Sequence, residues 1–142
     1  MKATLNWLGG VAWTAKSDSG HKIVIDGAPS IGGKNQGCRP MELVLKGLCS
    51  CSAMDVMAML VKQRQTVEKA EIHAEAERSK SVPAVFTKIH LQYSIDGADL
   101  KPSAVDRAVR LSMEKYCSVT KMLEPTVEIT YGVALNSVRL KK

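Results

Sequence analysis

The sequence has few aromatic side chains and lacks the apolar segments that mark secreted or membrane proteins. Phe, Trp and Tyr make up 4% of its 142 residues, so aliphatic side chains and seven Met must fill the core. The first ten residues contain no apolar run followed by small residues, so we expect no signal peptide and a cytoplasmic protein. Lys46 and Asp55 interrupt the longest apolar region, so we expect no membrane span.

Acidic residues are also fewer than basic ones, so the formal net charge is +6. The Lys and Arg side chains are scattered singly along the chain, apart from the C-terminal stretch VRLKK. Proteins that bind nucleic acid instead gather basic residues on one face or in one run. We therefore interpret the positive charge as a solvated surface, and nucleic acid is not an expected partner.

No pair of cysteines has the C-x-x-C spacing, although the chain contains Cys38, Cys49, Cys51 and Cys117. In a cytosolic chain of this length, such cysteines are typical of free, redox-active or metal-binding thiols rather than of a disulfide framework. The three histidines lie far apart in the sequence, and we expect neither a metal site nor a cofactor. Each cysteine taken alone is also compatible with a small buried apolar side chain.

Apolar periodicity predicts six strands and two main helices in the order βββ-α-ββ-α-β. This order belongs to the α+β class, and we expect one domain over residues 1–142. A loop rich in Gly, Pro and Ser precedes the first helix, and loops of this length are often functional. The expected strands are 2–7, 11–17, 22–26, 71–78, 85–96 and 126–133, and the expected helices are Met41–Gln65 and 101–116, followed by a helical turn at 118–123.

The strands at 71–78 and 85–96 alternate between apolar and polar residues, which predicts a half-exposed hairpin. The last strand shows the same alternation. The predicted inward-facing residues are Ile72, Ala74 and Ala76 on the first strand, Thr87, Ile89, Leu91, Tyr93 and Ile95 on the second, and Val127, Ile129, Tyr131 and Val133 on the last.

The first helix carries apolar side chains on nearly every side, a pattern typical of a helix that is covered all round. Pro40 suits the first helical position, and Glu42 lies in the first turn near the positive end of the helix dipole. A chain of 142 residues can hardly surround such a helix by itself. The pattern therefore favours an oligomer, although a sheet wrapped around the helix would also cover it.

Two cysteines of this helix, Cys49 and Cys51, are two residues apart and so point in directions about 200° apart around the axis. Only one of them can face a given pocket. Glu42 is nearly in line with Cys49 and lies on the opposite side from Cys51, so geometry within the helix favours a pairing of Glu42 with Cys49. A carboxylate beside a thiol raises the thiol pKa, so Glu42 would serve cysteine chemistry better by orienting a cation.

The segments RPMELVLKGLCSCSAMDVMAML and EKYCSVTKML resemble the two signature regions of the OsmC/Ohr family. These regions combine a Pro-x-Glu helix start, a cysteine eleven residues after the Pro, and a second cysteine in a Cys-x-Val setting. The eleventh residue after Pro40 is Cys51. The resemblance covers nearly the whole chain and implies that Cys51 is the reactive cysteine, that Cys117 is its partner, and that Cys49 is extra.

The resemblance further implies an intertwined homodimer with buried central helices and a site at the interface. The family reaction is reduction of an organic hydroperoxide or H2O2 by a thiolate, which becomes a sulfenic acid and then a disulfide that an external dithiol reduces. In the family, the helix-start glutamate, here Glu42, holds an arginine that activates the thiol. Ile31 stands at that arginine's spacing, so Arg39 is the candidate cation and Lys34 the alternative.

Within the family, the sequence is more similar to the less-characterised branch that carries PMEL and a CSA-x-DV segment. Two hypotheses about function follow. The first is a thiol-dependent peroxidase that uses Cys51, Cys117, Glu42 and Arg39. The alternative is a non-enzymatic dimeric module that binds a small apolar ligand at the interface while the cysteines only pack.

Overall fold

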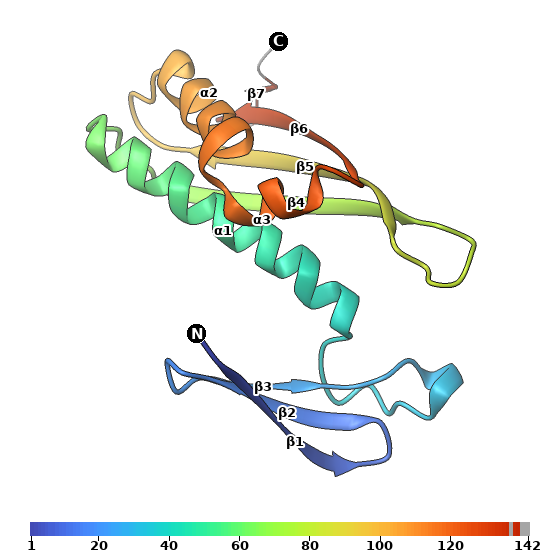
Figure 1. Cartoon of the computed structure of the whole chain (residues 1–142). Helices are drawn as coiled ribbons and strands as arrows, with labels where there is room; N and C mark the ends of the chain where they lie inside the picture. Colours follow the sequence, from blue (N-terminus) through green and yellow to red (C-terminus); the bar gives the residue numbers. More distant parts are fainter. Residues whose placement is uncertain (137, 140–142) are drawn as a thin grey trace. The chain divides into compact units, whose positions relative to one another are not determined.

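The computed structural model describes residues 1–136 and 138–139. The chain divides into two compact units, Met1–Lys46 and Gly47–Lys142, which are described separately. Figure 1 traces the elements of each unit in chain order. The last three residues of the basic stretch VRLKK lie outside the described residues.

The first unit is an antiparallel meander of β1 (Ala3–Gly9), β2 (Ala12–Ser17) and β3 (Lys22–Ile25), as the sequence predicts. Two tight turns join the strands, and Gly10 and Gly20 take the positive φ angles that these turns require. Trp7 lies opposite Trp13 in the register of β1 and β2. Aromatic cross-strand pairs of this kind stabilise a sheet.

The loop after β3 is held by one buried carboxylate. Asp26 accepts hydrogen bonds from the backbone N–H groups of Gly27, Lys34 and Gln36 at 2.8–3.0 Å. The bonds from Gln36 and Lys34 lower the pKa of Asp26 because they favour its charged form. The short 3-10 helix η1 (Pro29–Ile31) lies within this loop. The predicted loop is therefore compact and ordered around Asp26.

Many large apolar side chains of the first unit are exposed. The sheet has little core of its own, since Ala12 is its buried apolar residue among those described. Exposed apolar patches of this kind mark sites of contact with a protein, a membrane or a ligand. The exposed large apolar residues of this unit, besides Met1, are Leu5, Trp7, Leu8, Trp13, Ile23, Val24 and Ile31.

The second unit contains a four-stranded sheet in the order β4-β5-β6-β7. β4 (Lys69–Arg78) and β5 (Phe86–Asp96) form the predicted antiparallel hairpin, and β6 (Glu128–Leu135) runs parallel to β5. A short strand that the sequence did not predict, β7 (Val138–Arg139), pairs with β6. The α+β class and the predicted order of the main elements are confirmed.

The helical segments of the second unit lie on one face of its sheet (Figure 1). They comprise the part of α1 (Pro40–Lys62) after Lys46, then α2 (Pro102–Leu111), the π-helical turn η2 (Ser112–Tyr116), and α3 (Ser118–Leu123). The core between these helices and the sheet includes the inward-facing residues of β5. The buried apolar residues there include Leu48, Val56, Leu60, Val105, Ala108, Val109, Ile89, Leu91, Tyr93 and Ile95.

The helix α1 buries one face within the single chain. Leu48, Ser52, Val56 and Leu60 recur every four residues and are buried, whereas Met54 is 72% exposed. The all-round burial that the sequence predicts is therefore not reached in one chain. Among the described residues, α1 is also the helix that could cross a membrane by length and composition alone. Its buried face is typical of the core helix of a folded domain.

The inward-facing residues are predicted correctly along β6 and most of β5, but not at the start of β5. Ile89 to Ile95 alternate as expected, yet Thr87 is exposed and Phe86 is buried. The register shifts between Glu77 and Arg78, where Arg78 pairs with Phe86. This irregularity reverses the alternation locally. Ala76, which was also predicted to face inward, is exposed.

Candidate functional site

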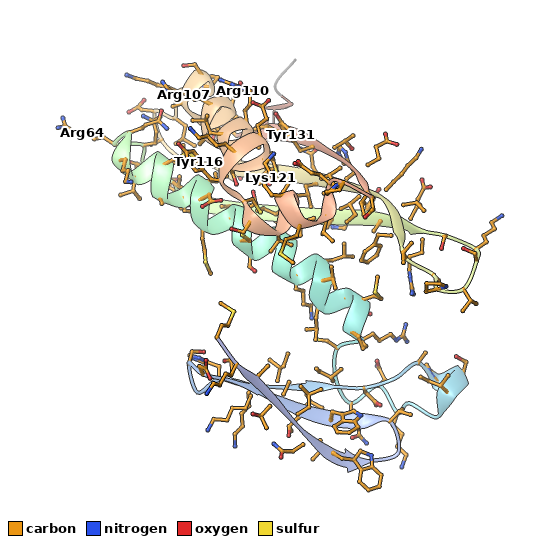
Figure 2. All side chains as sticks on the ribbon, in the orientation of Figure 1. Arg64, Arg107, Arg110, Tyr116, Lys121 and Tyr131 are labelled. Atoms are coloured by element: carbon orange, nitrogen blue, oxygen red, sulfur yellow. The ribbon has the colours of Figure 1, made fainter. Side chains whose placement is uncertain are left out.

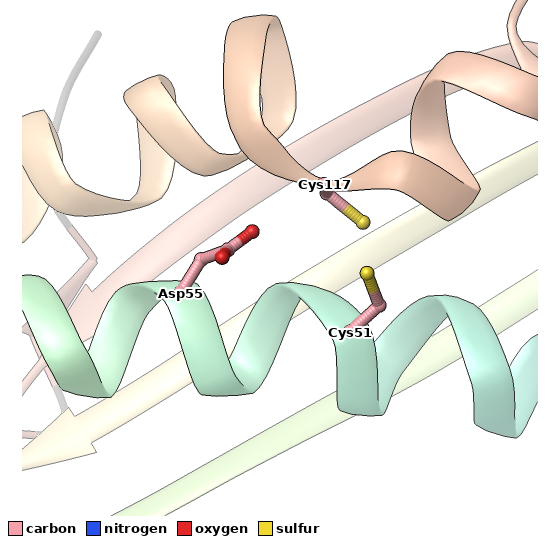
Figure 3. A group of neighbouring side chains, drawn as sticks. All are labelled: Cys51, Asp55 and Cys117. Atoms are coloured by element: carbon pink, nitrogen blue, oxygen red, sulfur yellow. The ribbon is translucent and has the colours of Figure 1, made fainter.

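Two cysteines and one aspartate from distant parts of the sequence meet in the second unit. The Sγ atoms of Cys51 and Cys117 and a carboxylate oxygen of Asp55 all lie within 4.8 Å of one another. Figure 3 shows the two sulfur atoms pointing toward each other, with the Asp55 carboxylate beside them. Cys51 and Asp55 are one turn apart on α1, which places them on the same helix face.

Cys117 is fixed by the turn that precedes it and the helix that follows it. Its backbone N–H donates to the Ser112 carbonyl at 2.8 Å, closing the π-helical turn. Such turns occur frequently at functional sites. The Sγ atom caps α3 by accepting the Thr120 N–H at 3.4 Å. The sequence Ser112–Thr120 therefore positions this thiol through local backbone geometry.

The Cys117 thiol is fully buried. Burial raises its pKa, the nearby Cys51 thiol adds to the rise, and hydrogen bonds from Thr120 oppose it. Cys117 therefore rests as a neutral thiol near neutral pH. Because the thiolate is the nucleophilic form of cysteine, Cys117 must lose its proton as it reacts.

A buried chain of hydroxyl groups leads from the sheet to Asp55. Tyr93 on β5 shares a hydrogen bond with Ser52, and Ser52 shares one of 2.9 Å with Ser112. The Ser112 hydroxyl donates to Asp55 Oδ2 at 3.2 Å. Burial raises the pKa of Tyr93, so its phenol stays neutral. This network holds the Asp55 carboxylate in a fixed orientation beside the two thiols.

The sequence patterns did not predict Asp55 or its hydroxyl partners as site residues, because Asp55 only interrupts an apolar region of the sequence. One signal was present, because an Asp four residues after a cysteine on a helix shares the face of that cysteine. The partners Ser52, Tyr93 and Ser112 carry no such signal. Their proximity depends on how α1, β5 and η2 pack together.

The predicted residues Glu42 and Arg39 lie in the first unit and contact each other through the backbone. Glu42 Oε2 accepts the Arg39 N–H at 3.0 Å, which is the hydrogen bond of a helix cap. The backbone N–H of Lys34, the alternative cation, donates to Asp26. The catalytic roles of Glu42 and Arg39 stay predictions.

The two extra cysteines differ in their surroundings. Cys38 accepts a hydrogen bond of 2.7 Å from the Lys46 ammonium, and this bond raises the pKa of Lys46. The sequence did not predict this thiol–ammonium contact. Cys49 is half-buried, and its burial raises the pKa of its thiol, with a smaller contribution from Cys117. Cys49 is therefore a protonated thiol near neutral pH.

A groove of about 500 Å³ opens next to Asp55 in the second unit. It has apolar walls and two basic side chains. Figure 2 labels Arg107 and Tyr116, which lie on the α2 and η2 side of this groove. The groove links the cluster around Asp55 to the surface, and a small molecule fits its volume. The lining residues are Asp55, Ala58, Met59, Lys62, Gln63, Arg107, Leu111 and Tyr116.

The chain has relatives of similar length. Residues 33–132 match the family described as "OsmC-like protein". Protein YhfA of Escherichia coli strain K12 is 44% identical over 132 residues, which are 93% of this chain and 96% of YhfA. The family match extends across the boundary between the two units.

Solved structures share the fold. The crystal structure of a hypothetical protein from Aquifex aeolicus VF5 is 31% identical, with a TM-score of 0.80, covering 94% of this chain and 96% of that one. An organic hydroperoxide resistance protein OsmC from Legionella pneumophila is 17% identical, with a TM-score of 0.70, covering 94% of this chain and 95% of that one. At 17% identity, the likeness concerns the fold alone.

Proposed function

The chain belongs to the OsmC-like protein family, and on that premise we propose that it reduces organic hydroperoxides or H2O2 with Cys51 as the attacking thiol and Cys117 as the resolving thiol. The observation that carries the proposal is the distance between the two sulfur atoms, which lie within 4.8 Å of each other. A structural neighbour named as an organic hydroperoxide resistance protein supports the choice of substrate class.

In the first step, Cys51 sulfur attacks one peroxide oxygen and the O–O bond breaks. The products are a Cys51 sulfenic acid and an alkoxide, or hydroxide in the case of H2O2. The thiol proton must leave sulfur and reach the departing oxygen. Asp55 lies on the same helix face as Cys51 with a carboxylate oxygen within 4.8 Å, so it accepts that proton and returns it to the leaving group.

In the second step, Cys117 sulfur attacks the sulfenic sulfur of Cys51. The disulfide forms, and the hydroxyl group leaves as water with the Cys117 proton. A disulfide requires the two sulfur atoms to approach to about 2.05 Å, so the Cys51 and Cys117 side chains move toward each other in this step. An external dithiol then reduces the disulfide and restores both thiols.

The remaining catalytic assignments come from the family resemblance. Arg39 supplies positive charge to the thiolate, with Lys34 as the alternative, and Glu42 orients that cation. The backbone N–H of Arg39 donates to Glu42 Oε2, which makes the two residues neighbours at the start of α1.

We also place the protein in the cytoplasm as a homodimer. The apolar side chains of α1 that one chain leaves uncovered, together with the exposed apolar residues of the first unit, support an interface between two copies. Sedimentation at micromolar concentration is expected to show twice the 15.4 kDa chain mass. A stable monomer would contradict this assignment.

Peroxide consumption with a dithiol reductant tests the reaction. We expect turnover of cumene hydroperoxide or H2O2 by the wild-type protein and by Cys49→Ala, and none by Cys51→Ser. The groove beside Asp55 favours one alternative function, in which the protein binds a small ligand and catalyses no reaction. A wild-type protein that consumes no peroxide above the buffer rate leaves only this binding function.

A further inference from the structure

We propose that Cys51, Asp55 and Cys117 form a binding site for a divalent transition metal, which the donor atoms identify as Zn²⁺. The two sulfur atoms and one carboxylate oxygen already lie within 4.8 Å of one another. Thiolate and carboxylate groups are both ligands of zinc in proteins. The inference goes beyond the proposed peroxidase function and does not depend on it.

The spacing of the donors is close to what zinc requires. Zinc binds sulfur at about 2.3 Å and carboxylate oxygen at about 2.0–2.2 Å in a tetrahedron, so its ligands lie about 3.5–3.8 Å apart. Donors within 4.8 Å reach that geometry through small side-chain movements. Cys51 and Asp55 stand four residues apart on α1, the same spacing by which a helix presents the two histidines of a zinc protease motif.

Two of the three donors already have the outer hydrogen bonds that orient metal ligands. Thr120 N–H donates to Cys117 Sγ at 3.4 Å. The Ser112 hydroxyl donates to Asp55 Oδ2 at 3.2 Å, and Ser112 is held in turn by Ser52. Outer partners of this kind fix the direction of a ligand and tune its affinity for metal.

Charge also favours a cation at this cluster. A dication is attracted to a carboxylate and to sulfur lone pairs, and cysteines that coordinate zinc do so as thiolates. The groove beside Asp55 leaves room for water as the fourth ligand.

Zinc and peroxide would compete for the same two sulfur atoms. Coordination to the ion lowers the nucleophilicity of both sulfur atoms, so Cys51 and Cys117 form a disulfide more slowly while the metal is bound. Bound Zn²⁺ is thus expected to protect both thiols from peroxide and from alkylating reagents.

The test is a titration of the full-length, reduced, metal-free protein with Zn²⁺ against a chromophoric chelator, and with Co²⁺ as a spectroscopic probe. We expect one ion per chain and, for Co²⁺, a near-ultraviolet absorption band from two thiolate ligands. Cys51→Ser, Cys117→Ser and Asp55→Asn should each weaken Zn²⁺ binding at least tenfold. The matched controls Cys49→Ser and Cys38→Ser should bind as the wild type does.

Three results would overturn the metal site. The wild-type protein could bind Zn²⁺ no more tightly than the Cys51→Ser, Cys117→Ser double variant does, or Asp55→Asn could leave the Zn²⁺ affinity unchanged. Loss of Zn²⁺ affinity in Cys38→Ser or Cys49→Ser would also contradict it. Circular dichroism checks that each variant is folded. If Asp55→Asn does not fold, the Co²⁺ spectrum of the wild type decides, because a spectrum without a thiolate band excludes the site. No peroxide is present in this titration, and adding a chelator to the peroxidase assay keeps that assay free of zinc, so either hypothesis can fail alone.

Discussion

The buried hydroxyl network offers a quantitative test, because α1 contains a matched pair of serines. Ser52 is fully buried and shares hydrogen bonds with Tyr93 and Ser112. Ser50, one half-turn away, is exposed and donates only a local bond of 3.2 Å to the Gly47 carbonyl. Ser→Ala raises helix propensity by the same amount at both positions, so the difference between the variants isolates the network.

We expect Ser52→Ala to lower the free energy of unfolding by about 1–3 kcal/mol relative to Ser50→Ala. The estimate takes two lost hydrogen bonds at about 0.5–1.5 kcal/mol each. Ser112 keeps its bond to Asp55, and Tyr93 keeps a contact of 3.2 Å with Met113 Sδ, so neither partner is fully orphaned.

Urea unfolding at one fixed protein concentration measures this difference, because the stability of an oligomer depends on concentration. The Cm values of the two variants should separate while their m-values stay equal. If Ser52→Ala and Ser50→Ala unfold within about 0.3 kcal/mol of each other, well below the two-bond estimate, the two hydrogen bonds of Ser52 contribute no net stability and the estimate is refuted.

Three further predictions concern pH, the contact between Cys38 and Lys46, and the strand register. Burial raises the pKa of Cys117 in the folded protein. Above the unfolded pKa of about 8.5, the unfolded chain therefore releases a proton that the native state keeps, and the free energy of unfolding should fall as pH rises through this range. The fall should be less steep in Cys117→Ser. Lys46→Met should slow alkylation of Cys38 by iodoacetamide in peptide mapping, because reactive cysteines lie in electropositive surroundings and the substitution removes the ammonium that contacts Sγ at 2.7 Å; an unchanged rate would contradict this. Phe86→Ala should lower stability by about 3–5 kcal/mol in urea unfolding while Thr87→Ala changes it little, and the reverse order would contradict the observed register.

The sequence predicts the main elements well because their signals are local. Pro40 and Glu42 mark the start of α1, and the helix begins at Pro40. The inward-facing residues of β5 from Ile89 to Ile95 follow a period of two. The reversal at Phe86 and Thr87 was missed because one register shift leaves no periodic signal.

The candidate site was predictable only in part. Geometry within one helix favoured a pairing of Glu42 with Cys49, and only the family resemblance pointed to Cys51 and Cys117. The proximity of these two sulfur atoms depends on the packing of α1 against the turn before α3, which no local pattern encodes. Asp55 was detectable from its position four residues after Cys51, but its hydroxyl partners were not.

Peptide mapping of the oxidised protein tests the central assignment most directly. The metal-free protein receives a mild dose of peroxide, is digested under non-reducing conditions, and is compared with Cys49→Ala and Cys51→Ser. The account predicts a disulfide between Cys51 and Cys117 in the wild type and in Cys49→Ala, and no such disulfide in Cys51→Ser. Oxidation of Cys49 in place of Cys51, or a Cys117 that never forms a disulfide, would contradict it.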